Sequence, residues 1–171
     1  MQRQETAIPT VGGEFATNAP ADVVDILLRD HARIRTCLDE LDGASSAAAA
    51  LPVLERLKGI VTVHHATEET LVYPALAKLA GEAIEPRKLY VETAEADMLL
   101  FELDNLARGI LDGDFENRCA TFTKAVRKHL DTEEQHAFPH LREKTANGQL
   151  AALNTAVRQY REKLHFEGVA F

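Results

Sequence analysis

Apolar residues recur every three to four positions along most of this chain, which is the period of an amphipathic helix. The pattern predicts four long helices, over residues 20–42, 52–79, 86–108 and 115–143. A further helix follows the Asn147-Gly148 break and carries apolar residues from Leu150 to Leu164. Because short turns join the four long helices, the pattern predicts an all-α, up-down-up-down four-helix bundle.

The same pattern divides the chain into three parts. Residues 1–19 show no period and are expected to form an N-terminal arm. Residues 20–145 form the predicted bundle, and residues 146–171 form an extra C-terminal helix that packs on it. Pro74 and Pro139 fall inside predicted helices and are expected to kink or end them.

Composition limits the function classes. The 171 residues are 46% hydrophobic with a formal net charge of −8, which fits one soluble domain and argues against nucleic acid as a partner. No apolar run approaches the length that spans a membrane, and no signal peptide is recognisable. The two cysteines form no CxxC motif, so we expect a cytoplasmic protein. We also expect a monomer or weak homo-oligomer.

Two stretches of the chain look like copies of one another. They read HHATEETLVYP from His64 and HLDTEEQHAFP from His129, so each contains H-x-x-x-E-E followed by an aromatic residue and a proline. Matched positions are 65 residues apart in both the histidine and the proline (129 − 64 and 139 − 74). The repeat predicts two similar helical units that contribute the same kind of side chains.

The repeated His and Glu interrupt apolar stripes. Residues four apart share one face of a helix, so His64 and Glu68 point the same way, as do His129 and Glu133. His31 is the polar member of the first helix's inner stripe. Such groups are costly inside a core unless something satisfies them. They form either a satisfied polar network or a site in which two facing pairs share one or two metal ions.

This combination resembles a hemerythrin-like, HHE cation-binding domain. The resemblance rests on Asp30-His31 upstream and on the two H-x-x-x-E copies with their proline endings. It implies a four-helix bundle with two non-heme iron ions, carboxylate- and oxo-bridged. His31 and His64 would then bind the first iron and His129 the second. The resemblance makes Glu68 and Glu133 the bridging carboxylates.

The third helix departs from the family pattern, because Ala96 stands where members usually place a histidine. One turn earlier, Glu92 lies on the same apolar stripe, and we expect it to replace the imidazole as a ligand to the second iron. A carboxylate makes the site harder and more anionic, which favours the higher oxidation state of iron. Reactivity with O2, peroxide or NO is therefore expected more than reversible O2 carriage.

We also state an expectation for each of four further residues near the motifs. His136 and Tyr90 are possible additional site residues, the first one turn beyond Glu133 and the second on the third helix. His65 is expected at the surface or at a helix end, and Tyr73 is expected to pack in the core like Phe138 in the other copy. No residue is assigned a catalytic role.

Three functions stay open from the sequence. The first is a di-iron protein that binds or reacts with O2, peroxide or NO in sensing or stress defence. The second is a peroxide-consuming or ferroxidase-type enzyme. The third is a structural or regulatory bundle that has lost its metal, which Ala96 keeps under consideration.

Overall fold

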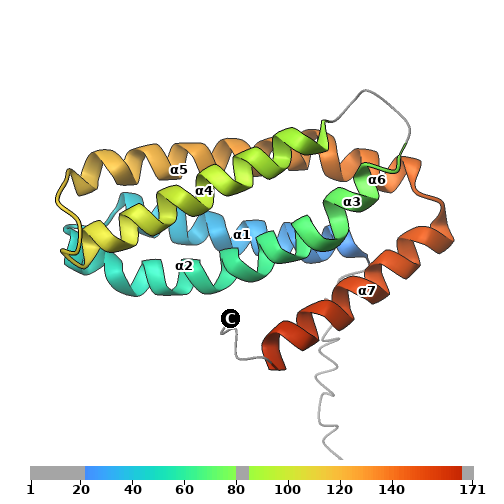
Figure 1. Ribbon diagram of the computed structural model, residues 1–171, viewed down its shortest axis with the longest axis horizontal. Helices are drawn as coiled ribbons and strands as arrows, with labels where there is room; N and C mark the ends of the chain where they lie inside the picture. Colours follow the sequence, from blue (N-terminus) through green and yellow to red (C-terminus); the bar gives the residue numbers. More distant parts are fainter. Residues whose placement is uncertain (1–21, 80–84, 167–171) are drawn as a thin grey trace, which may run out of the picture.

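The computed structural model describes residues 22–79 and 85–166, and every regular element among them is helical. Four long helices form the bundle, and a fifth lies beside it (Figure 1). They are α1 (Val23–Asp42), α2 (Ala47–Thr67), α4 (Pro86–Ala107), α5 (Phe115–Thr132) and the C-terminal α7 (Asn147–Phe166). The predicted all-α bundle with an extra helix is confirmed, whereas the expected N-terminal arm lies outside the described residues.

Side-chain caps set where the helices begin. Asp22 accepts from the backbone N–H of Asp25, and Asp25 accepts from that of Asp22, so α1 opens on a capping box. The Ser46 hydroxyl accepts from the N–H of Ala49, which starts α2 at Ala47, five residues before the predicted start at Pro52. The prediction was wrong there because Pro52 is tolerated inside the helix.

Both proline motifs follow a wide turn. The helix that begins as α2 passes through a π-helical turn, η1 (Glu68–Val72), into α3 (Tyr73–Leu76). The one that begins as α5 passes through η2 (Glu133–Ala137) into α6 (Phe138–Lys144). Proline lacks an N–H and its ring clashes with the carbonyl four residues before it, so a widened turn accommodates it without ending the helix. Each π turn begins at the glutamate of the repeated motif.

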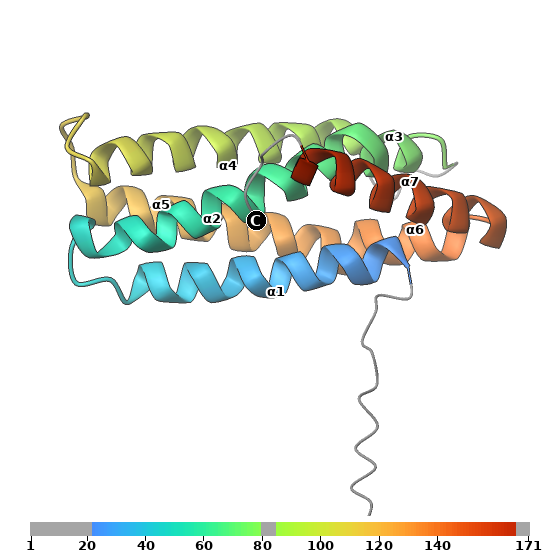
Figure 2. The ribbon, with the colours of Figure 1, turned by 90° about the horizontal axis from the view of Figure 1, so that it is seen from below.

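The helices form a closed ring. Neighbours along the chain pack together in the order α1, α2, α4 and α5, and α5 returns to α1. α7 crosses one end of this bundle and packs on α1, α2 and η1 (Figure 2). No helix among residues 22–79 and 85–166 is both long and apolar enough to span a membrane.

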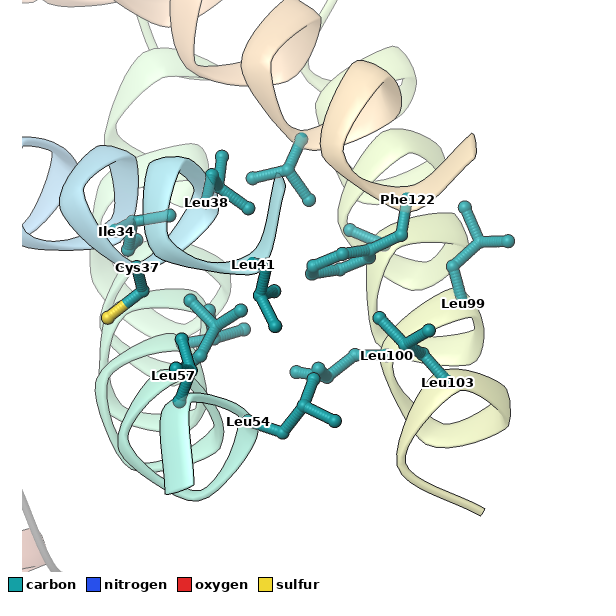
Figure 3. Packing of buried hydrophobic residues seen from close by; sticks show 14 of the residues in the cluster. Ile34, Cys37, Leu38, Leu41, Leu54, Leu57, Leu99, Leu100, Leu103 and Phe122 are labelled. Atoms are coloured by element: carbon teal, nitrogen blue, oxygen red, sulfur yellow. The ribbon is translucent and has the colours of Figure 1, made fainter. Parts of the chain in front are cut away.

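Two apolar clusters fill the bundle, and a polar layer lies between them. The first cluster occupies the half nearest the α1–α2 and α4–α5 turns and includes Leu38, Leu54, Leu103 and Phe122 (Figure 3). The second cluster gathers Leu27, Leu89, Phe138 and other side chains at the opposite end, under α7. Among them the described chain buries a set of polar side chains: His31, His64, His65, Thr67, Glu68, Thr93, His129 and Glu133.

Removing the largest side chain of the first cluster tests this arrangement. Phe122 is fully buried. We expect Phe122→Ala to lower the free energy of unfolding by about 3–5 kcal/mol, because it removes packed surface and leaves a cavity. The matched control is Phe101→Ala, since Phe101 is 67% exposed and its truncation should change stability by less than about 0.5 kcal/mol. Equal effects of the two changes in denaturant unfolding would contradict the assigned core.

Candidate metal centre

One histidine–glutamate cluster is formed by residues of α1, of the continuous helix α2–η1, and of η2. His31 from α1, His64 from α2, Glu68 from η1 and Glu133 from η2 each offer an atom, and these four atoms lie within 4.8 Å of one another. All four side chains are at most 1% exposed. Residues from distant parts of the sequence thus meet at one level of the bundle with metal-binding atoms facing inward.

Short distances join the members of this cluster. Nε2 of His31 lies 3.1 Å from Nε2 of His64 and 3.3 Å from Oε2 of Glu133. Within the repeated motifs, Nε2 of His64 is 3.3 Å from Oε1 of Glu68, and Nε2 of His129 is 3.5 Å from Oε2 of Glu133. His129 therefore lies near the same carboxylate oxygen of Glu133 as His31 does, which brings a second imidazole to that oxygen.

Tyr73 is a site residue that the sequence interpretation assigned to core packing. Its ring is fully buried, but its hydroxyl lies 2.8 Å from Oε1 of Glu133 and 3.1 Å from Oε2 of Glu68. The Thr93 hydroxyl on α4 lies 3.1 Å from the hydroxyl oxygen of Tyr73. The difference between Tyr73 and Phe138 at matched positions was the available signal, because only the first copy carries a hydroxyl there.

The protonation states of the two glutamates diverge. Burial, and next the negative charge of Glu133, raise the pKa of Glu68 well above its ordinary value. Burial alone would also raise the pKa of Glu133, but the hydrogen bond with His31 and the interaction with His129 lower it to about 2. The Tyr73 phenol keeps its proton, because burial and both glutamates raise its pKa. One phenol therefore lies between an ionised Glu133 and a Glu68 that favours the acid form.

The histidines are backed by carboxylates on their other ring nitrogen. Nδ1 of His31 lies 2.8 Å from Oε1 of Glu134, and Nδ1 of His64 lies 3.5 Å from Oδ2 of Asp30. Arg161 of α7 donates to both oxygens of Asp30. Metal-bound histidines usually donate their second N–H to such a group, which fixes the ring and its tautomer. Burial lowers the pKa of His64 to about 4, so its ring is neutral and available at neutral pH.

Glu92, the expected helix-three ligand, lies behind His129. Its Oε2 is 3.5 Å from Nδ1 of His129, whereas Nε2 of that ring faces Glu133. Glu92 is only 12% exposed, and Lys88 and Lys128 lie within 4.0 Å of its Oε1. This position matches that of Glu134 behind His31. It places Glu92 to orient His129, and direct binding of metal by Glu92 stays a prediction.

Several buried atoms of the centre have no hydrogen-bond partner among the described residues. They are Nδ1 of His64, Oε1 of Glu68, both carboxylate oxygens of Glu92, Nδ1 of His129 and Oε2 of Glu133. An unsatisfied buried carboxylate oxygen costs free energy, so unpaired Glu68 and Glu133 oxygens near imidazole nitrogens fit a cation that would complete them. Imidazole and carboxylate donors together suit iron, among other divalent ions.

The remaining candidates take different positions. His136 is exposed, and the Tyr90 hydroxyl donates to the backbone carbonyl of Glu69, so neither side chain joins the buried cluster. Tyr90 instead packs its ring edge-on against Tyr73, at 4.9 Å between ring centroids. His65 was expected at the surface or at a helix end. It lies in the last turn of α2, but its side chain is only 4% exposed, and its Nδ1 lies 2.7 Å from Oδ1 of Asp97.

Comparison with known proteins identifies one family. Residues 22–141 match the family described as the Hemerythrin HHE cation binding domain. No curated protein and no solved structure matched the chain. The match spans α1 to α6 up to Leu141 and so includes every residue of the cluster described above.

The position of the Tyr73 hydroxyl makes a testable prediction for the metal-free protein. Tyr73→Phe leaves two buried carboxyl groups without this partner, so we expect the free energy of unfolding to fall by about 1–3 kcal/mol. Tyr90→Phe is the matched control, because Tyr90 is 36% exposed and its hydroxyl donates to the backbone carbonyl of Glu69. Denaturant unfolding of both variants would reveal the difference, and equal stability of Tyr73→Phe and the wild type would refute the assignment.

Proposed function

The chain belongs to the hemerythrin HHE cation-binding family, and on this premise we propose that it is a non-heme di-iron protein that binds or reacts with O2, peroxide or NO. We further propose a role in sensing or stress defence, in the cytoplasm. The observation that carries the proposal is the pair of buried, unpaired carboxylate oxygens, Oε1 of Glu68 and Oε2 of Glu133, which lie beside Nε2 of His64 and His31.

The proposed binding residues fall into two halves that share the glutamates. His31 and His64 hold one ion through Nε2, and His129 holds the other. Glu68 and Glu133 are the proposed bridging carboxylates: Glu68 lies 3.3 Å from Nε2 of His64, and Glu133 lies 3.3 Å from Nε2 of His31 and 3.5 Å from Nε2 of His129. Asp30, Glu92 and Glu134 fix the rings from behind. Two bound ferrous ions would supply the electrons that reduce O2 or peroxide.

The protein's own groups would manage protons at this centre. Burial and the charge of Glu133 raise the pKa of Glu68, and a bound cation would lower it again because a cation favours the carboxylate form. The Tyr73 hydroxyl contacts both glutamates and holds the nearest phenolic proton. Apolar clusters on both sides exclude water, which strengthens the electrostatic interactions within the layer.

A peroxide-consuming enzyme is the second candidate, and one observation favours it. Cleavage of peroxide would be assisted by a hydrogen-bond donor at the centre, and the Tyr73 hydroxyl lies within 3.1 Å of both glutamates. The two candidates use the same residues, and turnover alone distinguishes them.

Anaerobic loading with ferrous iron tests the metal content. We expect two ions per chain and a higher melting temperature, since a ligand at about 100 times its Kd adds about 2.7 kcal/mol per site. Glu133→Ala should lose most of this gain, because Glu133 lies between the two halves. Glu143→Ala, at an exposed position of α6, should behave as the wild type. A wild-type protein that takes up no iron would disprove the di-iron proposal.

Exposure of the loaded protein to peroxide tests the reactivity. We expect the absorption spectrum to change at once, with one oxidation event per centre in a protein that only binds or senses. Continuous loss of excess peroxide, with Tyr73→Phe slower than Tyr90→Phe, would instead establish the enzyme. An iron-loaded protein whose spectrum responds to none of O2, peroxide and NO would overturn both candidates.

A further inference from the structure

Four buried histidines of the bundle share one arrangement. In each, Nδ1 faces a carboxylate of another helix: those of His31 and His65 are hydrogen-bonded at 2.8 and 2.7 Å, and those of His64 and His129 lie 3.5 Å from theirs without a hydrogen bond. The pairs are His31 with Glu134, His64 with Asp30, His129 with Glu92, and His65 with Asp97. The first three belong to the centre proposed above. His65 is therefore backed in the same way as the histidines that hold metal, although neither sequence motif assigns it a role.

The ring of His65 lies against the half of the centre that has fewer imidazoles. Its centroid is 6.0 Å from that of His129, with the ring planes at 83°, and 5.7 Å from that of His64. In the first half, the rings of His31 and His64 are 4.8 Å apart at 72°. His65 and His129 thus form a second edge-to-face imidazole pair, like the one that His31 and His64 form.

The neighbouring helix carries a small side chain at the corresponding position. Across the α2–α4 interface, Ala96 is buried and presents only a methyl group, so α4 supplies no ring nitrogen at this position. The next residue, Asp97, is half exposed and takes Nδ1 of His65. Among the described residues, the polar contact of His65 runs through Nδ1 to Asp97. Nε2, at the opposite edge of the ring, is not part of that contact.

We infer that His65 is the second imidazole of the His129 half, binding the second ion through Nε2 while Asp97 holds Nδ1. The inference rests on the proposed di-iron function and deepens it. It reassigns the missing helix-three donor to α2: the histidine that follows His64 in the chain replaces the one that Ala96 lacks. Asp97 is then the positioning residue that keeps the ring in place.

The decisive variant is His65→Asn, because the asparagine amide nitrogen can still donate to Asp97 while no atom replaces Nε2. Iron would be added anaerobically as ferrous ion, and bound iron per chain, the affinity of each ion and the absorption spectrum would be measured. We expect two ions in the wild type, one tightly held ion in His65→Asn, and a changed spectrum. His140→Ala, on α6 outside the buried cluster, is the matched histidine control and should bind two.

Two further variants keep the test informative if His65→Asn folds poorly. Asp97 is exposed on its outer side, so Asp97→Asn should fold normally and weaken the second ion about 10- to 100-fold. Introducing Ala96→His into His65→Asn should restore the second ion, because it returns an imidazole from α4. Two ions at wild-type affinity and an unchanged spectrum in both His65→Asn and Asp97→Asn would overturn the inference alone. A wild-type protein without iron would overturn the proposed function as well.

Discussion

The structure depends on the burial of two carboxyl groups, Glu68 and Glu133, at one level of a bundle that is otherwise apolar above and below. Like charges so close together cannot both ionise freely in a dry interior, and the raised pKa of Glu68 beside the low pKa of Glu133 expresses this conflict. The Tyr73 hydroxyl relieves part of it. A bound cation would relieve the rest, which explains why the layer is buried at all.

A second set of charges extends the layer toward the surface. Each buried histidine contacts a carboxylate through Nδ1, and some of these carboxylates contact cations in turn: Glu134 with Arg35, and Asp30 with Arg161. Because Arg161 belongs to α7, the C-terminal helix is linked through Asp30 to His64. The bundle and its extra helix therefore stabilise the same side chains, and the orientation of each ring is set from outside the centre.

The fold and the proposed ligands follow from local patterns in the sequence. Helical period located the four long helices, and the duplicated H-x-x-x-E motif located His64, Glu68, His129 and Glu133, because residues four apart share a face whatever the tertiary structure. Tyr73, Thr93 and His65 could not be assigned in this way. Their roles depend on which atoms of other helices lie opposite them. The spacing of an aromatic residue or a histidine along a helix does not show whether its polar atom meets a partner inside the core. The predicted start of α2 at Pro52 was too late, because the Ser46 side chain caps the helix earlier and Pro52 is accommodated inside it.

The most direct test of the account is anomalous X-ray scattering at the iron edge from crystals of the iron-loaded protein. The account predicts two peaks within the polar layer, one contacting Nε2 of His31 and His64 and one contacting Nε2 of His129 and His65, with Glu68 and Glu133 between them. Peaks outside this layer, or none, would contradict the assignment of the buried layer as a metal centre.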